Sequence, residues 1–253
     1  MTEYNPAFVR TAANKAGYLD LRAHPDGSQP APMGLFSDDP YATQRRVLFH
    51  DAELGVAVGW LAACTGDALQ VHPFDEFLLV EEGELAIETA AGAERLAAGE
   101  AAVIPKGLSC RLAGSASSRV AFMLAGATSR RWPLPSSIVR VGQDGQLDPA
   151  PPIPAELLTT PAPTVEGRVD YADASGQFRA GVWRAAAYRR RPVESRQHEL
   201  MKIVEGHAEL DSPAVGLQRF EVGDIFLTAR GADYALGSDT TFRKIFCCFR
   251  PSA

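Results

Sequence analysis

The chain contains the same motif twice, and this internal repeat is the strongest constraint on its fold. Three residues of the first copy recur 123 positions later, so that Trp60, Glu76 and Gly83 correspond to Trp183, Glu199 and Gly206. Past a one-residue insertion the match continues at an offset of 124, as far as Phe122 and Phe246. A repeat of half the chain length indicates duplication of a whole domain, because solenoids stack much shorter units.

The 253 residues therefore divide into two domains of roughly 125 residues, each large enough to bury its own core. We expect residues 1–128 to form an N-terminal arm and a first barrel, and residues 129–253 to form a proline-rich linker or arm and a second barrel. Short apolar runs such as residues 77–80 and 101–104 are separated by glycines in both halves. This pattern predicts an all-β fold, with an antiparallel sandwich or barrel in each half.

The connection between the halves, residues 132–163, is rich in proline and predicts extended chain. It also resembles the N-terminal arm, since residues 8–10 are echoed by residues 138–140 and residues 19–20 by residues 147–148. A duplicated arm indicates that this segment packs as part of each unit, across the barrel pair.

The composition excludes several classes of partner. A formal net charge of −6 argues against a general nucleic-acid binder, because binding to phosphates needs a basic surface. The first residues show no basic segment followed by an apolar stretch, and the longest apolar run, around residues 54–64, is too short to span a bilayer. The cysteines at positions 64, 110, 247 and 248 form no CxxC pair, which favours reduced thiols. We expect a cytoplasmic protein with a small-molecule ligand and no nucleic-acid or membrane partner.

The spacing of several residues in the first half matches a known pair of motifs. His72 stands four residues before Glu76, which is followed by six residues and Gly83. The residues Gly99, Pro105, Gly107 and Cys110 then follow with the spacing of the second motif, with Cys110 in the place of its histidine. These motifs resemble those of the cupin superfamily, and in particular the branch of (S)-ureidoglycine aminohydrolase-like bicupins. The resemblance implies two tandem antiparallel jelly-roll barrels.

The resemblance also implies a metal site inside the first barrel, where alternate strand residues point inward. Most metal-binding cupins hold their ion with three histidines and a glutamate; the same four positions here are Gln70, His72, Glu76 and Cys110. A glutamine offers only a neutral carbonyl oxygen, whereas a thiolate is a soft ligand. One imidazole, one carboxylate and one thiolate can hold zinc with an open fourth position, and iron, nickel and manganese are the other candidate metals.

These residues have alternative roles. His72 and Glu76 are metal ligands, a general acid/base couple, or a structural hydrogen-bonded pair. Cys110 is a ligand, a nucleophile activated by His72, or a buried packing residue. We take His72, Glu76 and Cys110 as the candidate catalytic residues.

The second half carries Val193, Ser195, Glu199 and Tyr234 at the four corresponding positions. A lone carboxylate with two hydroxyl groups offers too few donors for a metal ion. We interpret Ser195, Glu199 and Tyr234 as a second-barrel pocket. In that pocket Glu199 hydrogen-bonds Tyr234, contacts an amine of a ligand, or is a buried polar residue with satisfied hydrogen bonds.

Two hypotheses for the function remain. In the first, the chain is a metal-dependent enzyme whose first barrel hydrolyses or deaminates a C–N bond of a small nitrogen-containing metabolite. In the second, the metal sites have been lost, and the chain is a non-catalytic bicupin that binds a metabolite or a partner protein. Under both hypotheses we expect a homodimer.

Overall fold

Antiparallel strands make up nearly all of the regular structure. The computed structural model describes residues 17–24, 38–62, 65–126, 128, 136–142 and 144–252. Two short 3-10 turns, η1 (Ala42–Gln44) and η2 (Ala155–Leu157), interrupt the strands. Within these ranges no helix is long and apolar enough to cross a membrane. The predicted all-β fold is confirmed.

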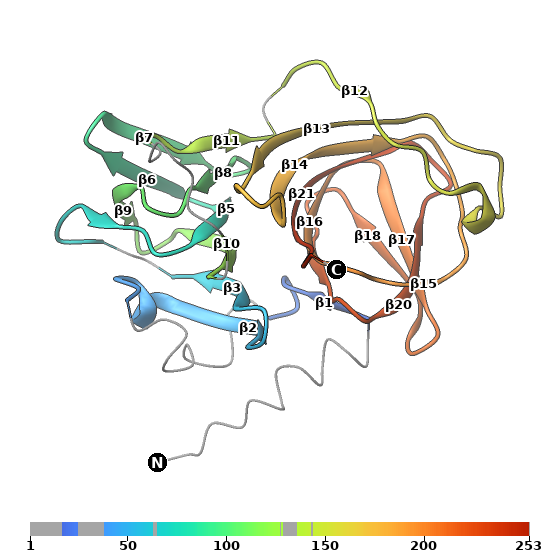
Figure 1. Cartoon of the computed structure of the whole chain (residues 1–253), viewed down its shortest axis with the longest axis horizontal. Helices are drawn as coiled ribbons and strands as arrows, with labels where there is room; N and C mark the ends of the chain where they lie inside the picture. The colour runs from blue at the N-terminus through green and yellow to red at the C-terminus, as the bar shows by residue number, and fades with distance from the viewer. Residues whose placement is uncertain are drawn as a thin grey trace, which may run out of the picture.

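The first barrel consists of two packed sheets (Figure 1). Its large sheet has six strands in the order β11 (Val139–Val141), β8 (Ala101–Ile104), β5 (Asp75–Glu82), β10 (Arg119–Ala125), β3 (Val56–Leu61) and β2 (Arg45–Asp51). Its small sheet has the order β4 (Gln70–Val71), β9 (Ser109–Gly114), β6 (Glu84–Thr89) and β7 (Gly92–Ala97).

The second barrel repeats this arrangement. Its large sheet has seven strands in the order β1 (Tyr18–Asp20), β19 (Ile225–Thr228), β16 (His198–Glu205), β21 (Phe242–Phe249), β14 (Phe178–Ala185), β13 (Val165–Ala172) and β12 (Asp148–Pro149). Its small sheet has the order β15 (Val193–Glu194), β20 (Asp233–Gly237), β17 (His207–Ser212) and β18 (Gly216–Glu221). Gly83 and Gly206 form the matching tight turns after β5 and β16, with φ of 73° and 66°, values that favour glycine.

Two strands cross between the barrels (Figure 1). In the N-terminal half, β1 pairs with β19 of the second barrel, with Tyr18 opposite Thr228. In the connection, β11 pairs with β8 of the first barrel, with Val139 opposite Val103. Asp148 lies in β12, which pairs with β13 of its own barrel, so the two arms are not equivalent in their pairing. Residues 8–10 lie outside the described ranges. The division at residue 128 stays a prediction, and each half supplies a strand to the other.

Both faces of the central strands of each large sheet are buried. In β5, Phe77 and Leu79 belong to a core cluster that contains residues of both barrels, whereas Leu78 and Val80 belong to a cluster inside the first barrel. Because successive strand residues point to opposite faces, one face of β5 lines the barrel and the other packs against the second barrel. This interface joins the two barrels through apolar contact.

Equivalent positions of the two halves add polar contacts to that interface. Asp75 precedes Glu76, and its Oδ1 accepts hydrogen bonds from the hydroxyl of Tyr171 at 2.5 Å and from the backbone of Lys106 at 2.9 Å. Asp75 therefore points out of the first barrel, as the alternation along the strand predicts. Its counterpart His198 precedes Glu199.

The ring of His198 also reaches the other barrel. Its Nδ1 accepts the backbone N–H of Arg230 at 3.1 Å, and its Nε2 lies 3.0 Å from Oδ2 of Asp51. Since Nδ1 is an acceptor, Nε2 carries the proton and donates to Asp51. Each barrel thus uses the residue before its motif glutamate, Asp75 or His198, for a polar contact with the other barrel.

The Tyr171→Phe variant tests the contribution of this interface. We expect the free energy of unfolding to fall by about 1–3 kcal/mol, because the buried carboxylate of Asp75 loses one of its donors. Urea unfolding measures the change. Tyr18→Phe is the control, since the Tyr18 ring packs edge-on against Phe220 at 5.4 Å and its hydroxyl bonds no other described residue. Equal losses in the two variants would contradict the assignment.

Candidate functional site

The structure brings three of the four predicted first-barrel ligands into the barrel interior. His72 precedes β5, Glu76 lies in β5 and Cys110 in β9, and each is at most 1% exposed. Gln70 lies opposite Cys110 in the pairing of β4 with β9, but it is exposed. His72, Glu76 and Cys110 therefore form one buried group, with Gln70 at its edge.

A buried arginine that the sequence analysis did not identify completes this group. Arg45, in β2, is fully buried, and its Nη2 donates to Oε2 of Glu76 at 3.0 Å. Its Nε donates to Asp39 on the other side. The Nε2 of His72 lies 2.8 Å from Oε2 of Glu76. The carboxylate of Glu76 is thus held between a guanidinium and an imidazole.

These contacts decide the charges of the group. Burial alone would raise the pKa of Glu76, but the charge of Arg45 and the contact with His72 outweigh it and lower the pKa to about 2. Burial and, second, the charge of Glu76 raise the pKa of Cys110 to about 12. Glu76 is therefore ionised at neutral pH, and Cys110 is a neutral thiol, which is a poor ligand and a poor nucleophile.

The group does not fit a divalent metal ion in this arrangement. A metal site needs free carboxylate oxygens and deprotonated thiols, whereas both oxygens of Glu76 already face Arg45 or His72. The guanidinium of Arg45 places a fixed positive charge against the carboxylate that would bind the ion, and a second cation there is repelled.

The second barrel contains an open space, which we call the inner cavity. It has a volume of about 410 Å³, and its lining includes the three predicted pocket residues Ser195, Glu199 and Tyr234. Oε1 of Glu199 lies 2.8 Å from Nζ of Lys244, and Nε2 of Gln197 donates to Oε2 at 3.1 Å. Glu199 therefore also pairs with a cation of the protein, while the hydroxyl of Tyr234 donates to Thr228 at 3.1 Å.

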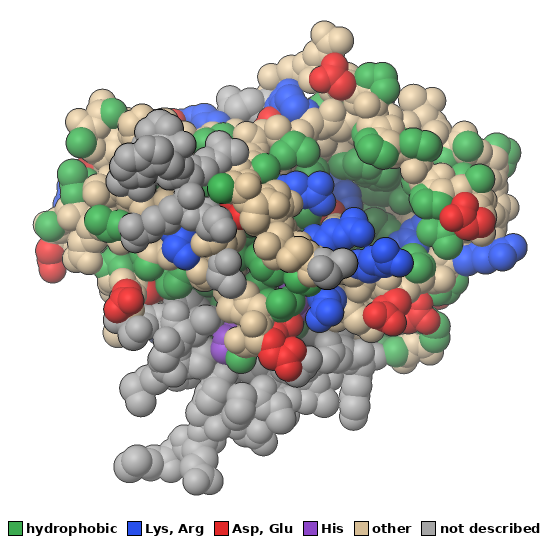
Figure 2. Space-filling model, in the orientation of Figure 1, with side chains coloured by type: hydrophobic (Ala, Val, Ile, Leu, Met, Phe, Trp, Pro, Cys, Tyr) green, Lys and Arg blue, Asp and Glu red, His purple; other side chains and the backbone are tan. Residues whose placement is uncertain are grey.

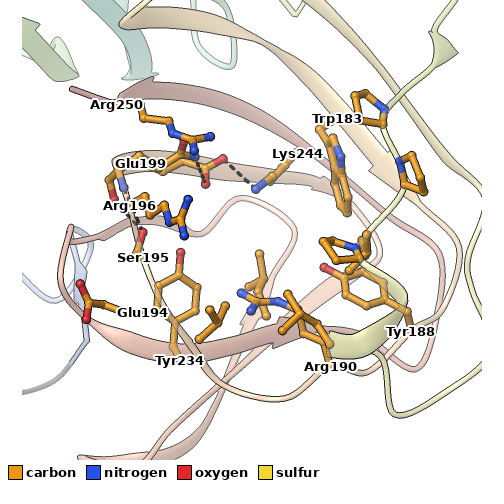
Figure 3. Close-up of a pocket in the computed structure, with 18 residues that line it drawn as sticks. Trp183, Tyr188, Arg190, Glu194, Ser195, Arg196, Glu199, Tyr234, Lys244 and Arg250 are labelled. Carbon is orange, nitrogen blue, oxygen red and sulfur yellow. Dashed lines mark hydrogen bonds and ion pairs between the residues drawn. The ribbon is translucent and has the colours of Figure 1, made fainter. Parts of the chain in front are cut away.

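Aromatic and basic side chains line the inner cavity together with prolines and aliphatic residues (Figure 3). Nζ of Lys244 lies 5.2 Å from the ring centroid of Trp183, whose ring in turn lies 6.2 Å from that of Tyr188. The guanidinium of Arg190 lies 5.5 Å from the ring centroid of Tyr234. Burial and, second, the charge of Glu199 raise the pKa of Tyr234, so its hydroxyl stays protonated and can donate a hydrogen bond. The cavity combines flat apolar walls with fixed charges.

Sequence reasoning missed the two cations that pair with the motif glutamates. Lys244 stands in the apolar run of β21 at the position of Val120 in the first half, and a lysine within such a run was the available signal. Arg45 begins an alternating strand and gave no comparable signal. Trp183 packs against the apolar core and also lines the inner cavity.

A further group of possible metal ligands lies outside both motifs. One ligand atom each of His207, Glu209 and Asp239 lies within 4.8 Å of the others. Arg189 Nη2 lies 2.6 Å from Oε2 of Glu209, and Arg219 Nη2 lies 3.2 Å from Nδ1 of His207. Since arginine only donates, Nδ1 accepts, and the proton of a neutral ring sits on Nε2, 2.9 Å from Asp239. Arg189 therefore already pairs with Glu209, and the N–H of His207 already faces Asp239.

No family model matches this chain, and no curated protein sequence matches it. Among solved structures, a Pseudomonas syringae pv. tomato protein of the DUF861 family, of unknown function, is 26% identical with a TM-score of 0.77, and the match covers 87% of this chain and 92% of that one. Protein Ylba from E. coli, also of DUF861, is 12% identical with a TM-score of 0.53, and the match covers 93% and 92% of the two chains.

A cupin 2 conserved barrel domain protein from Leptotrichia buccalis is 8% identical, with a TM-score of 0.52 over 81% of this chain and 87% of that one. Each half also has two packed antiparallel sheets, so each half of the chain has the cupin fold.

The described cysteines 110, 247 and 248 are free thiols, and Cys64 lies outside the described residues.

The depressed pKa of Glu76 predicts a specific loss of stability in acid. The folded-state pKa of about 2 lies below the reference value of 4.5, so the stabilisation is present above pH 4.5 and is lost as the pH falls toward 2. Between about pH 5 and pH 3 this carboxyl accounts for about 2 kcal/mol of lost stability.

We expect Glu76→Gln to reduce this pH dependence, measured as the free energy of urea unfolding at several pH values. Glu156→Gln, which changes an exposed glutamate, is the matched control. A pH dependence of Glu76→Gln equal to that of the unsubstituted protein would contradict the charge assignment.

Proposed function

We propose that this bicupin binds a small metabolite in the inner cavity of the second barrel. The observation that carries the proposal is the placement of the Glu199–Lys244 pair on the wall of an open cavity of about 410 Å³. A cavity of this size suits a small organic molecule. The fixed ammonium of Lys244 takes the part that a metal ion has in metal-binding cupins, since it neutralises the motif glutamate and leaves donors for a ligand.

The lining supports binding of a ligand with one flat apolar part. Trp183 and Tyr188 offer ring faces, which contribute to affinity through apolar burial. Glu199 accepts, Lys244 donates, and the hydroxyl of Tyr234, which donates to Thr228, can accept, so polar groups on the ligand can be oriented. The walls also lie on strands of both sheets of the barrel, which holds these groups in fixed positions.

The alternative is the metal-dependent C–N hydrolase of the (S)-ureidoglycine aminohydrolase-like branch, with its centre at His72, Glu76 and Cys110. The burial of these three residues in one group favours this alternative. The pairing of Glu76 with Arg45 argues against it, because a divalent ion would have to displace a buried guanidinium. The homodimer and the cytoplasmic location stay predictions.

Ligand-induced thermal stabilisation tests the proposal. A panel of small carboxylates, amines and neutral aromatic compounds is screened, and a hit at 100 times its Kd should stabilise the fold by about 2.7 kcal/mol. In the double variant Lys244→Met with Glu199→Gln we expect binding of the hit to weaken at least about tenfold, because two charged hydrogen-bonding groups are removed.

The matched control is the double variant Arg45→Met with Glu76→Gln, which removes the corresponding buried ion pair of the first barrel. We expect it to bind the hit as the unsubstituted protein does. If instead this control loses the ligand and the second-barrel variant keeps it, the site is in the first barrel and the proposal is wrong.

Elemental analysis separates the proposal from the metalloenzyme alternative. We expect substoichiometric zinc, iron, nickel and manganese in protein purified without an affinity tag or chelator. Stoichiometric metal that disappears in His72→Ala would support the alternative and contradict the assignment of the ligand site to the second barrel.

A further inference from the structure

A second depression, which we call the outer basin, adjoins the inner cavity. It has a volume of about 570 Å³ and shares Glu194, Ser195, Arg196 and Arg250 with the lining of the inner cavity. The two spaces therefore meet along a common wall near β15. Figure 2 shows basic side chains gathered around this hollowed face of the second barrel.

The outer basin is strongly basic in an acidic protein. Its lining contains four arginines, Arg179, Arg196, Arg230 and Arg250, and a single carboxylate, that of Glu194, while the chain as a whole has a net charge of −6. In Figure 3 the carboxylate of Glu194 points away from the inner cavity. The guanidinium groups of Arg196 and Arg250 lie on the side of the inner cavity. The wall between the two spaces thus presents positive charge.

These arginines differ from those elsewhere on the surface. Arg119, Arg140 and Arg184 each form ion pairs with two glutamates. In the part of the chain that the structure describes, Arg196, Arg230 and Arg250 form no ion pair. The Nε of Arg179 is buried without a hydrogen-bond partner there. Several guanidinium groups that line one depression and form no ion pairs are an arrangement that proteins use to bind carboxylates and phosphates.

The backbone around the outer basin is held in place by hydrogen bonds. Arg250 donates its N–H to the carbonyl of Gln177 at 2.9 Å, which ties the end of β21 to the turn after β13. Gly231 donates to the carbonyl of Ser195 at 2.8 Å, which ties the turn after β19 to the bend between β15 and β16 that carries Arg196. The arginines therefore extend from a fixed rim, which reduces the entropy lost when they bind a ligand.

We propose that the ligand of this protein is an organic anion whose carboxylate or phosphate group binds Arg196 and Arg250 at the outer basin, while its flat apolar body lies against Trp183 in the inner cavity. The placement of the apolar part of the ligand in the inner cavity rests on the proposed function. The inference adds that the ligand is an anion and that its anionic group faces the outer basin. Arg179 and Arg230 supply further positive charge behind the anionic group.

Calorimetric titration of the whole protein at low salt tests this inference, with phenyl phosphate, benzoate, benzamide and inorganic phosphate as probes. We expect at least one of the two aromatic anions to bind at least tenfold more tightly than neutral benzamide, because charge-assisted hydrogen bonds are stronger than neutral ones. The ratio between phenyl phosphate and benzoate shows which anionic group the basin prefers. Equal binding of benzamide and of both anions would overturn the inference, whereas it would leave a neutral ligand of the inner cavity possible.

Variants locate the two halves of the ligand. We expect Arg196→Gln with Arg250→Gln to weaken binding of the preferred aromatic anion by about tenfold or more for each arginine and to reduce its salt dependence. Arg191→Gln is the matched control, since Arg191 is exposed and lies outside both linings. Trp183→Leu should weaken binding of the aromatic anion and leave binding of inorganic phosphate unchanged.

Each result has a defined meaning once unchanged thermal unfolding shows that the variants are folded. If the double arginine variant binds the anion as tightly as Arg191→Gln does, the outer basin is not the anion site. If phosphate binding falls in Trp183→Leu as much as aromatic binding does, the proposed orientation is wrong.

Discussion

Burial of both faces of the central strands of the large sheets is the constraint on which the rest of the molecule depends. One face of β5 and of β16 lines a barrel, and the opposite face packs into the interface with the other barrel. Adjacent residues on these strands therefore have different surroundings. Glu76 points into the first barrel, while Asp75 reaches Tyr171 across the interface. Any change that shifts the register of these strands would exchange the two sets of residues.

Buried carboxylates are then the main electrostatic cost of the fold, and the protein meets this cost with its own cations. Glu76 pairs with Arg45, Glu199 with Lys244, and Glu209 with Arg189. Breaking a buried ion pair by removing one partner leaves an uncompensated charge, so these cations are difficult to replace singly. They come from different strands in the two barrels, since Arg45 lies in β2 and Lys244 in β21. The duplicated halves thus reached a similar electrostatic balance with different residues.

The space inside the two barrels differs accordingly. The first-barrel group is buried and its carboxylate is surrounded by an arginine and a histidine. In the second barrel the motif glutamate borders an open cavity that adjoins the arginine-lined outer basin. The sequence motif marks the same strand position in both halves, whereas access to that position depends on the side chains that surround it. For this reason the better match to the motif, in the first half, did not coincide with the more accessible site.

The sequence by itself determined the duplication, the antiparallel strands and the strand positions of Glu76 and Glu199, because repeat spacing and the alternation of apolar residues are local properties of the chain. It also placed Ser195, Glu199 and Tyr234 in one pocket through the resemblance between the halves. Only the tertiary structure decided which cation neutralises each glutamate, which strands cross between the barrels, and which barrel is open. Arg45 and Glu76 are 31 residues apart and Lys244 and Glu199 are 45 apart, so their pairing follows from sheet packing. The arginines of the outer basin likewise come from separate segments that meet only when the second barrel closes.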